Sequence, residues 1–174
     1  YATPEPIDAL TMATHVAFLR KGEILQYGEV RDVYINPSHA AVGSYFCHPQ
    51  MNMIPCAVEN RESGDCLLRV SQELAFEVGL DRETLPRDRY LLGIRPHHLY
   101  IDDPRDRMVQ FQANVELAEV VGSNTELHLV HGAIRVSLLM QRVKRFPVGK
   151  EVTAFIDPEE LYIFESETGD FVTR

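Results

Sequence analysis

The chain has 174 residues, of which 45% are hydrophobic, and its 26 acidic and 17 basic residues give a formal net charge of −9. This length supports one good core or two small ones. No apolar run approaches the roughly 20 residues that cross a membrane, the N-terminus lacks a signal-peptide pattern, and the acidic balance argues against binding nucleic acid through its phosphates.

Residues 1–49 predict a short mixed α/β segment. Thr3-Pro4-Glu5 is a favourable helix start, and Ser38 is placed to cap a later helix. Two strand-like runs around Lys21-Gly22 predict a hairpin. These elements do not enclose a core of their own, so their apolar faces indicate the end of a larger α/β domain. Because the first residue is Tyr1 rather than methionine, we expect a fragment or a processed product.

From residue 50 onward the pattern is almost entirely β. Short runs with alternating apolar residues are separated by Gly, Asn and Pro, which is typical of a small barrel or sandwich. Phe111, Ala113, Val115 and Leu117 alternate strictly, which predicts a strand with these four side chains on one face. The charged stretch 102–107 is the best candidate for a seam between two β units.

A repeat supports two units. Five residues of the stretch 94–101 (Ile-x-Pro-x-x-Leu-Tyr-Ile) return sixty-two positions later in 156–163. A weaker match relates 64–70 to 124–130 at an offset of sixty. We therefore predict a duplicated β unit in which a strand, a sharp Pro turn and a second short strand are built twice.

Most residue groups that could carry chemistry have a plainer interpretation. The phosphate-binding pattern GxxxxGK[ST] is absent, so we expect no ATP binding or hydrolysis by this chain alone. Cys47, Cys56 and Cys66 lack zinc-ligand spacing and are interpreted as reduced, partly buried residues. The adjacent His97 and His98 point to opposite faces of a strand, so no metal site is expected.

The carboxylates of residues 157–160 lie on an exposed Pro turn, which does not separate their pKa values as acid–base catalysis requires. No catalytic residue is expected.

Contacts with a ligand or partner are expected elsewhere. The stretch 122–126 combines a glycine with side chains that hydrogen-bond to hydroxyls or oxyanions, although a hydrophilic β-turn demands the same residues. Arg95, beside Pro96, could cap the Pro turn or meet an acidic partner, but packing at the surface is the favoured interpretation. The candidate contact residues are Arg95, His98, Ser123, Asn124, Thr125 and Glu126.

Several motifs together resemble a known family. Those in the N-terminal segment are Tyr1-Ala2-Thr3, Val16-Ala17-Phe18-Leu19-Arg20-Lys21-Gly22-Glu23-Ile24 and Gln26-Tyr27-Gly28, and Met51-Asn52-Met53 continues the match just after it. They resemble the last part of an ABC transporter nucleotide-binding domain. Gly93-Ile94-Arg95-Pro96-His97-His98-Leu99 and Val121-Gly122-Ser123-Asn124-Thr125-Glu126-Leu127-His128 resemble the C-terminal regulatory domain of sugar-importer ATPases of maltose or glycerol-3-phosphate type.

The resemblance implies a fold class and a division of the chain. The expected fold is mainly β, a tandem of small OB-like barrels called a transport-associated domain, preceded by a short α/β tail of an ABC ATPase domain. Residues 1–49 would be that tail and residues 50–174 the regulatory domain. The Walker A, signature and Walker B motifs are missing, so ATP and Mg would be cofactors of the full-length parent only. Pro4 stands where the family carries a histidine that senses the γ-phosphate, and proline has no side-chain donor for that role.

Two functions follow as hypotheses. The first is a regulatory and dimerisation segment of a cytoplasmic ATPase subunit, which lies at the inner face of the membrane and works as a homodimer with transmembrane permease subunits. The alternative is a stand-alone OB-like module that binds a small sugar or oxyanion. Neither involves nucleic acid, and the transported substrate is not encoded in these residues.

Overall fold

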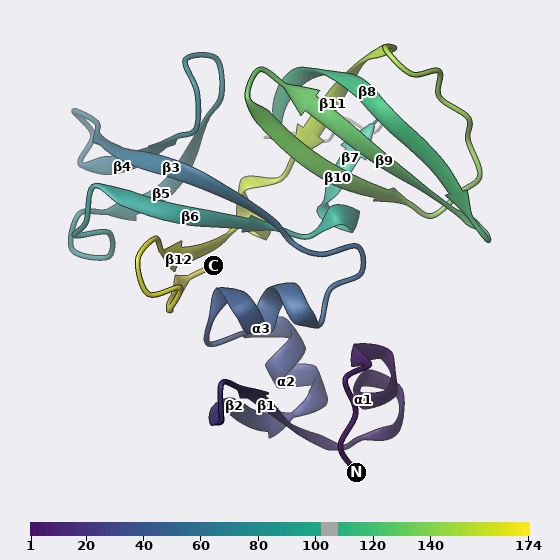
Figure 1. Cartoon of the computed structure of the whole chain (residues 1–174). Helices are drawn as coiled ribbons and strands as arrows, with labels where there is room; N and C mark the ends of the chain where they lie inside the picture. The colour runs from purple at the N-terminus through teal and green to yellow at the C-terminus, as the bar shows by residue number, and fades with distance from the viewer. Residues whose placement is uncertain (102–107) are drawn as a thin grey trace.

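The computed structural model describes residues 1–101 and 108–174, so the predicted seam at 102–107 lies outside the described residues. Figure 1 shows a small N-terminal α/β segment below two curled β-sheets. The chain is mainly β, as predicted, and its sheets are OB-like half-barrels.

The N-terminal segment contains a hairpin and three short helices. Its elements are α1 (Pro6–Met12), β1 (His15–Arg20), β2 (Glu23–Glu29), α2 (Val30–Ile35) and α3 (Ala40–Tyr45). The predicted hairpin is confirmed: Lys21 and Gly22 both adopt positive φ, at 52° and 87°, which is the geometry of the tightest hairpin turns.

Two helix starts differ from the prediction. The cap of α1 is Glu5, because Pro6 opens the helix; the Thr3 hydroxyl accepts the Glu5 N–H at 3.0 Å and donates to the Asp8 carboxylate at 3.1 Å. The cap of α3 is His39 rather than Ser38, since His39 Nδ1 accepts the Ala41 N–H at 2.9 Å. The expectation that this segment has no core was also wrong, because four side chains form a small buried cluster (Val16, Val33, Val42 and Phe46).

The β region forms two antiparallel sheets. The first has the order β13 (Phe171–Thr173), β12 (Tyr162–Glu165), β6 (Arg89–Ile94), β3 (Asn52–Asn60), β4 (Asp65–Arg69), β5 (Ala75–Asp81). The second has the order β10 (Ile134–Met140), β9 (Asn124–His131), β8 (Val109–Val121), β11 (Glu151–Ile156), β7 (Leu99–Ile101).

Each copy of the repeat gives its last short strand to the other sheet. The 3₁₀ turn η1 (Pro96–His98) leads from β6 in the first sheet to β7 in the second. The turn η2 (Pro158–Glu160) leads from β11 in the second sheet back to β12 in the first. The strand–turn–strand element is therefore present twice. The second strand of each copy pairs in the sheet that contains the first strand of the other copy. The weaker sequence match, between 64–70 and 124–130, falls on β4 and β9, which hold equivalent places in the two sheets.

One hydrophobic core extends through both sheets. Phe111, Ala113 and Val115 of β8 are buried in it, on the one face that their alternation predicts. Leu117 is instead 42% exposed, because a bulge between Val115 and Leu117 shifts the register against β9 and turns the side chain outward.

The three cysteines, Cys47, Cys56 and Cys66, are unpaired and buried. Among the described residues, no helix has the length and apolar character of a membrane span.

Candidate functional site

Arg95 lies at the junction between the N-terminal segment and the β region. It is 1% exposed and directly precedes η1, where Pro96 favours the extended backbone that Arg95 adopts. Its guanidinium lies over the Tyr34 ring, at 3.9 Å from the ring centroid, and its Nη2 donates to the Tyr34 carbonyl. Its Nε donates to the Tyr162 hydroxyl at 3.3 Å. The expected surface packing of Arg95 was wrong, because α2 and β12 cover the side chain.

The Arg95 guanidinium is held mainly by aromatic faces and neutral acceptors. Its Nη1 has no hydrogen-bond partner among the described residues. Burial raises the pKa of the Tyr34 hydroxyl and of the Cys47 thiol, and the charge of Arg95 acts against both changes. A buried cation without partners lowers the stability of the fold. The planar guanidinium group offsets this cost because it stacks on aromatic rings and donates several hydrogen bonds at once.

Backbone hydrogen bonds and apolar side chains complete the same junction. The Ala40 N–H donates to the Gly169 carbonyl at 2.7 Å, and the Phe171 N–H donates to the Ser38 carbonyl at 3.0 Å. The buried side chains here come from α3, the residues after it, and β12: Ala40, Cys47, Met51, Tyr162 and Phe164. The end of the N-terminal segment is thus attached to the hairpin of β12 and β13 near the C-terminus (Figure 1).

The two Pro turns meet beside this junction. His98 of η1 and Glu160 of η2 are equivalent positions of the repeat, and Nδ1 of His98 lies 3.2 Å from Oε2 of Glu160. Arg174 donates to the same carboxylate, and its guanidinium lies 5.1 Å from the Tyr162 ring centroid. A continuous set of contacts therefore runs from Tyr34 through Arg95 and Tyr162 to the two turns.

Burial lowers the pKa of both histidines of η1. It lowers the pKa of His97 to about 4, with the charges of His98 and Arg95 acting in the same direction. Burial also lowers the pKa of His98, although Glu160 acts to raise it.

The predicted contact stretch 122–126 is a tight turn followed by a strand. Gly122, at φ 61°, and Ser123 form the two-residue turn, while Asn124, Thr125 and Glu126 already belong to β9. Thr125 is fully buried, and its hydroxyl contacts the carbonyls of Arg142 and Lys144 at 2.8 and 3.2 Å. The Glu126 carboxylate lies 3.5 Å from His128 Nε2. These residues belong to the turn after β8 and to β9, whereas Arg95 and His98 belong to the turn η1 and the residue before it.

Pro4 and Asp157 have local roles. The Pro4 carbonyl accepts the Tyr45 hydroxyl at 2.7 Å, which ties the start of α1 to the end of α3. The Asp157 carboxylate accepts the Glu159 N–H at 3.0 Å and so caps η2.

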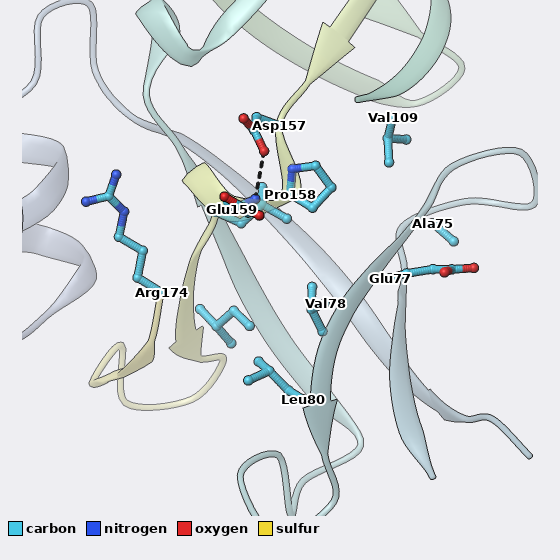
Figure 2. Close-up of a pocket in the computed structure, with 11 residues that line it drawn as sticks. Ala75, Glu77, Val78, Leu80, Val109, Asp157, Pro158, Glu159 and Arg174 are labelled. Carbon is cyan, nitrogen blue, oxygen red and sulfur yellow. Dashed lines mark hydrogen bonds between the residues drawn. The ribbon is translucent and has the colours of Figure 1, made fainter. Parts of the chain in front are cut away.

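Two clefts occupy equivalent places in the two halves. The larger, of about 930 Å³, lies between β5 and the turn η2 (Figure 2). The smaller, of about 500 Å³, lies between β10 and the turn η1. Leu161 and Ile163 line the first cleft where their repeat partners Leu99 and Ile101 line the second.

Three residues of these sites were not found from the sequence. Tyr34 and Arg174 have no local signal, because their partners Arg95 and Glu160 lie 61 and 14 positions away. Asn52 is 8% exposed, and its amide accepts from the Ser137 N–H at 2.7 Å and donates to the Ser137 carbonyl at 2.8 Å, so it joins β3 to β10. Its only signal was a place inside the Met51-Asn52-Met53 motif.

Comparisons with known proteins agree with this architecture. A family described as TOBE domain matches residues 92–164. The chain is 24% identical to the uncharacterized ABC transporter ATP-binding protein YurJ of Bacillus subtilis, over 99% of this chain and 48% of the relative. It is 27% identical to the sn-glycerol-3-phosphate import ATP-binding protein UgpC 3 of Rhizobium etli, over 97% of this chain and 45% of the relative. It is 28% identical to the trehalose/maltose import ATP-binding protein MalK of Thermococcus litoralis, over 97% of this chain and 47% of the relative.

The chain spans about half the length of these curated relatives. Among solved structures, the cytoplasmic molybdate-binding protein ModG matches with a TM-score of 0.50 and 13% identity, over 64% of this chain and 94% of ModG. At that identity the likeness concerns the fold alone.

Proposed function

We propose that this chain, which is the C-terminal region of a sugar-type ABC transporter ATP-binding protein and carries a TOBE domain, couples the end of the ATPase domain to a regulatory β region. The observation that carries the proposal is the junction at Arg95. A buried guanidinium between Tyr34 and Tyr162 makes the N-terminal segment and the β region move together.

Exposed apolar side chains support the assignment of the N-terminal segment to an ATPase domain. Besides the first residue, Tyr1, five large ones are more than 60% exposed: Ile7, Met12, Leu19, Ile24 and Tyr27. A surface of this kind is costly in water and is usually covered. In the proposed assembly the rest of the ATPase domain covers it and binds ATP and Mg, permease subunits contact that domain, and the region lies at the cytoplasmic face of the membrane. The transported solute is a sugar or a related compound.

A second apolar surface suits dimerisation. Leu117, Val120 and Val121 are exposed at the end of β8. Val143 is 61% exposed and lies beside them, because its neighbours Arg142 and Lys144 contact Thr125, the strand partner of Val120. We propose that this β8 patch joins two copies of the chain.

Sedimentation velocity tests the dimer. We expect a concentration-dependent dimer at micromolar concentration, and V120E with V121E should leave monomer. The matched control is I24E, which adds the same charge at an exposed apolar position of the N-terminal segment. A chain that stays monomeric at 100 μM, or a dimer that only I24E dissociates, would contradict the proposal.

The absence of a phosphate-binding loop leads to a further part of the proposal, that the chain alone does not bind ATP. Calorimetric titration with MgATP should give only heats of dilution. Saturable binding would refute this part.

The alternative, a stand-alone module for a sugar or oxyanion, has weaker support. The hydroxyl of Thr125 is already used by the loop that follows β10. Titration with maltose, glycerol 3-phosphate and molybdate tests it directly, and saturable binding of any of them would favour it.

A further inference from the structure

The larger cleft has a sheet edge as one of its walls. β5 is the last strand of its sheet, so within the described residues its outer N–H and C=O groups have no strand partner. The turn η2 forms the opposite wall (Figure 2). Natural sheets protect such edges with lysine, proline or a covering element, and β5 contains neither residue.

A bulge in β5 points apolar side chains into this cleft. Leu67 pairs with Glu77 and Asp65 with Asp81, so three residues of β5 lie opposite Cys66 alone. Gly79, in the middle of the three, adopts φ +62°, which a larger residue rarely does. Because the bulge interrupts the alternation, the adjacent residues Glu77 and Val78 both line the cleft, together with Leu80.

The equivalent edge in the other half, β10, is covered by a turn and a short strand. There η1 and β7 lie against β10, and the cleft has about half the volume, 500 Å³ against 930 Å³. The two halves share one repeated pattern, so the larger cleft at β5 is a specific feature of the first half.

The composition of the cleft selects the chemistry of its occupant. Its floor is apolar, with Val78, Leu80, Leu161 and Ile163. Its rim carries the carboxylates of Glu77, Asp157 and Glu159. Arg174 is the basic residue that lines the cleft, and its guanidinium is paired with the Glu160 carboxylate. The Glu77 side chain is 69% exposed and forms an ion pair with Arg61 at 2.7 Å. An anion is therefore repelled, whereas a basic side chain is attracted.

We propose that β5 binds an extended segment of a partner protein as an added strand, and that this segment alternates apolar with basic side chains. Strand addition satisfies the open edge of β5 with backbone hydrogen bonds. Alternate apolar side chains then enter the cleft, and the basic ones meet the acidic rim. This inference goes beyond the proposed function and does not depend on it.

The test uses a defined probe, an acetylated and amidated peptide of six residues in which valine and lysine alternate. Its control has the same sequence with every second backbone nitrogen methylated, which keeps the charge and removes donors from one edge. Binding to the full chain is measured by calorimetry, and the contact is mapped by amide chemical shifts in NMR. We expect saturable 1:1 binding with shifts at residues 75–81, and a loss of binding by the methylated peptide.

Peptide binding by three variants distinguishes binding at this cleft from general electrostatic attraction of a basic peptide to an acidic protein. L80D should weaken binding about tenfold, since it removes an apolar contact from the floor. E159K should weaken it about threefold, and the matched control E119K, at an exposed position on β8, should not change it.

Three results would overturn the proposal: equal binding of both peptides, equal effects of E159K and E119K, or shifts outside β5 and η2. Self-association of the chain through β5 without peptide would assign the cleft to a second copy and would also overturn it.

Discussion

His98 and Glu160 occupy the same position in the two copies of the repeat, and their side chains meet where the two Pro turns come together. Nδ1 of His98 lies 3.2 Å from Oε2 of Glu160, at an angle that forms no hydrogen bond. The ring is partly buried and lies close to the charges of Arg95 and Arg174 as well as Glu160. Two cations and burial outweigh one carboxylate, so the pKa of His98 is lowered.

The first prediction concerns pH. The folded chain lowers the pKa of His97 from its ordinary 6.5 to about 4. Between these values the unfolded chain binds a proton that folded His97 rejects, so the stabilisation present above pH 6.5 is lost as the pH falls towards 4. We expect His97 to account for about 1–3 kcal/mol of this loss in the free energy of unfolding.

Urea unfolding at pH 7 and pH 5 measures this effect. H97Q should reduce the difference between the two pH values, and H15Q, at an exposed position of β1, is the matched control. An H97Q protein with the same pH dependence as the unmodified chain would show that another group is responsible.

The second prediction concerns Arg95. R95K keeps the charge and loses the planar group that stacks on Tyr34 and reaches the Tyr162 hydroxyl. We expect faster amide hydrogen exchange in α2 and α3, with the central strands of both sheets unchanged, because the junction opens before the core does.

Y162F is the matched control for Arg95. It removes a single hydrogen bond of 3.3 Å, which costs about 1 kcal/mol, and it keeps the ring. Uniformly faster exchange in R95K would mean that Arg95 stabilises the whole fold rather than the junction.

The third prediction concerns Thr125. Its hydroxyl is fully buried, bonds to the Arg142 carbonyl at 2.8 Å and accepts the Lys144 N–H at 3.0 Å. T125V preserves the shape and leaves these backbone groups without that partner, so the free energy of unfolding should fall by about 1–3 kcal/mol. T125S keeps the hydroxyl and should recover most of the loss in urea unfolding. Equal stability of T125V and the unmodified chain would return Thr125 to the list of ligand contacts.

The repeat allowed the sequence to predict much of the β region. Alternation identified the strands, and the residues shared by 94–101 and 156–163 identified the two Pro turns. The exchange of β7 and β12 could not be predicted, because a short apolar strand fits either sheet equally well. The direction in which each Pro turn leaves its sheet decides the partner, and that direction depends on packing between the halves.

The junction was beyond sequence reasoning for a related reason. Arg95 contacts Tyr34, 61 positions before it, and Tyr162, 67 positions after it. A lone arginine beside a proline has the pattern of a surface residue, since buried arginine is rare. Leu117 alternates with the three buried residues before it, and the bulge that turns it outward leaves no mark in an alternating pattern.

The last prediction concerns the hydrogen bonds by which the Asn52 side chain joins the two sheets. Asn52 of β3 donates to the carbonyls of Ile94 and Ser137, at 3.1 and 2.8 Å, and accepts the Ser137 N–H at 2.7 Å. In N52L the Ser137 groups lose their partner in a buried place, which should cost about 2–4 kcal/mol.

N114L, on the exposed face of β8, is the matched control and should change the free energy of unfolding by less than about 0.5 kcal/mol. Urea unfolding followed by circular dichroism measures both variants, and NMR shows whether amides of β3 and β10 lose protection together. Because Asn52 is the side chain that bridges β3 and β10, a stable N52L protein with both strands still protected would mean that the shared apolar core alone holds the two halves together.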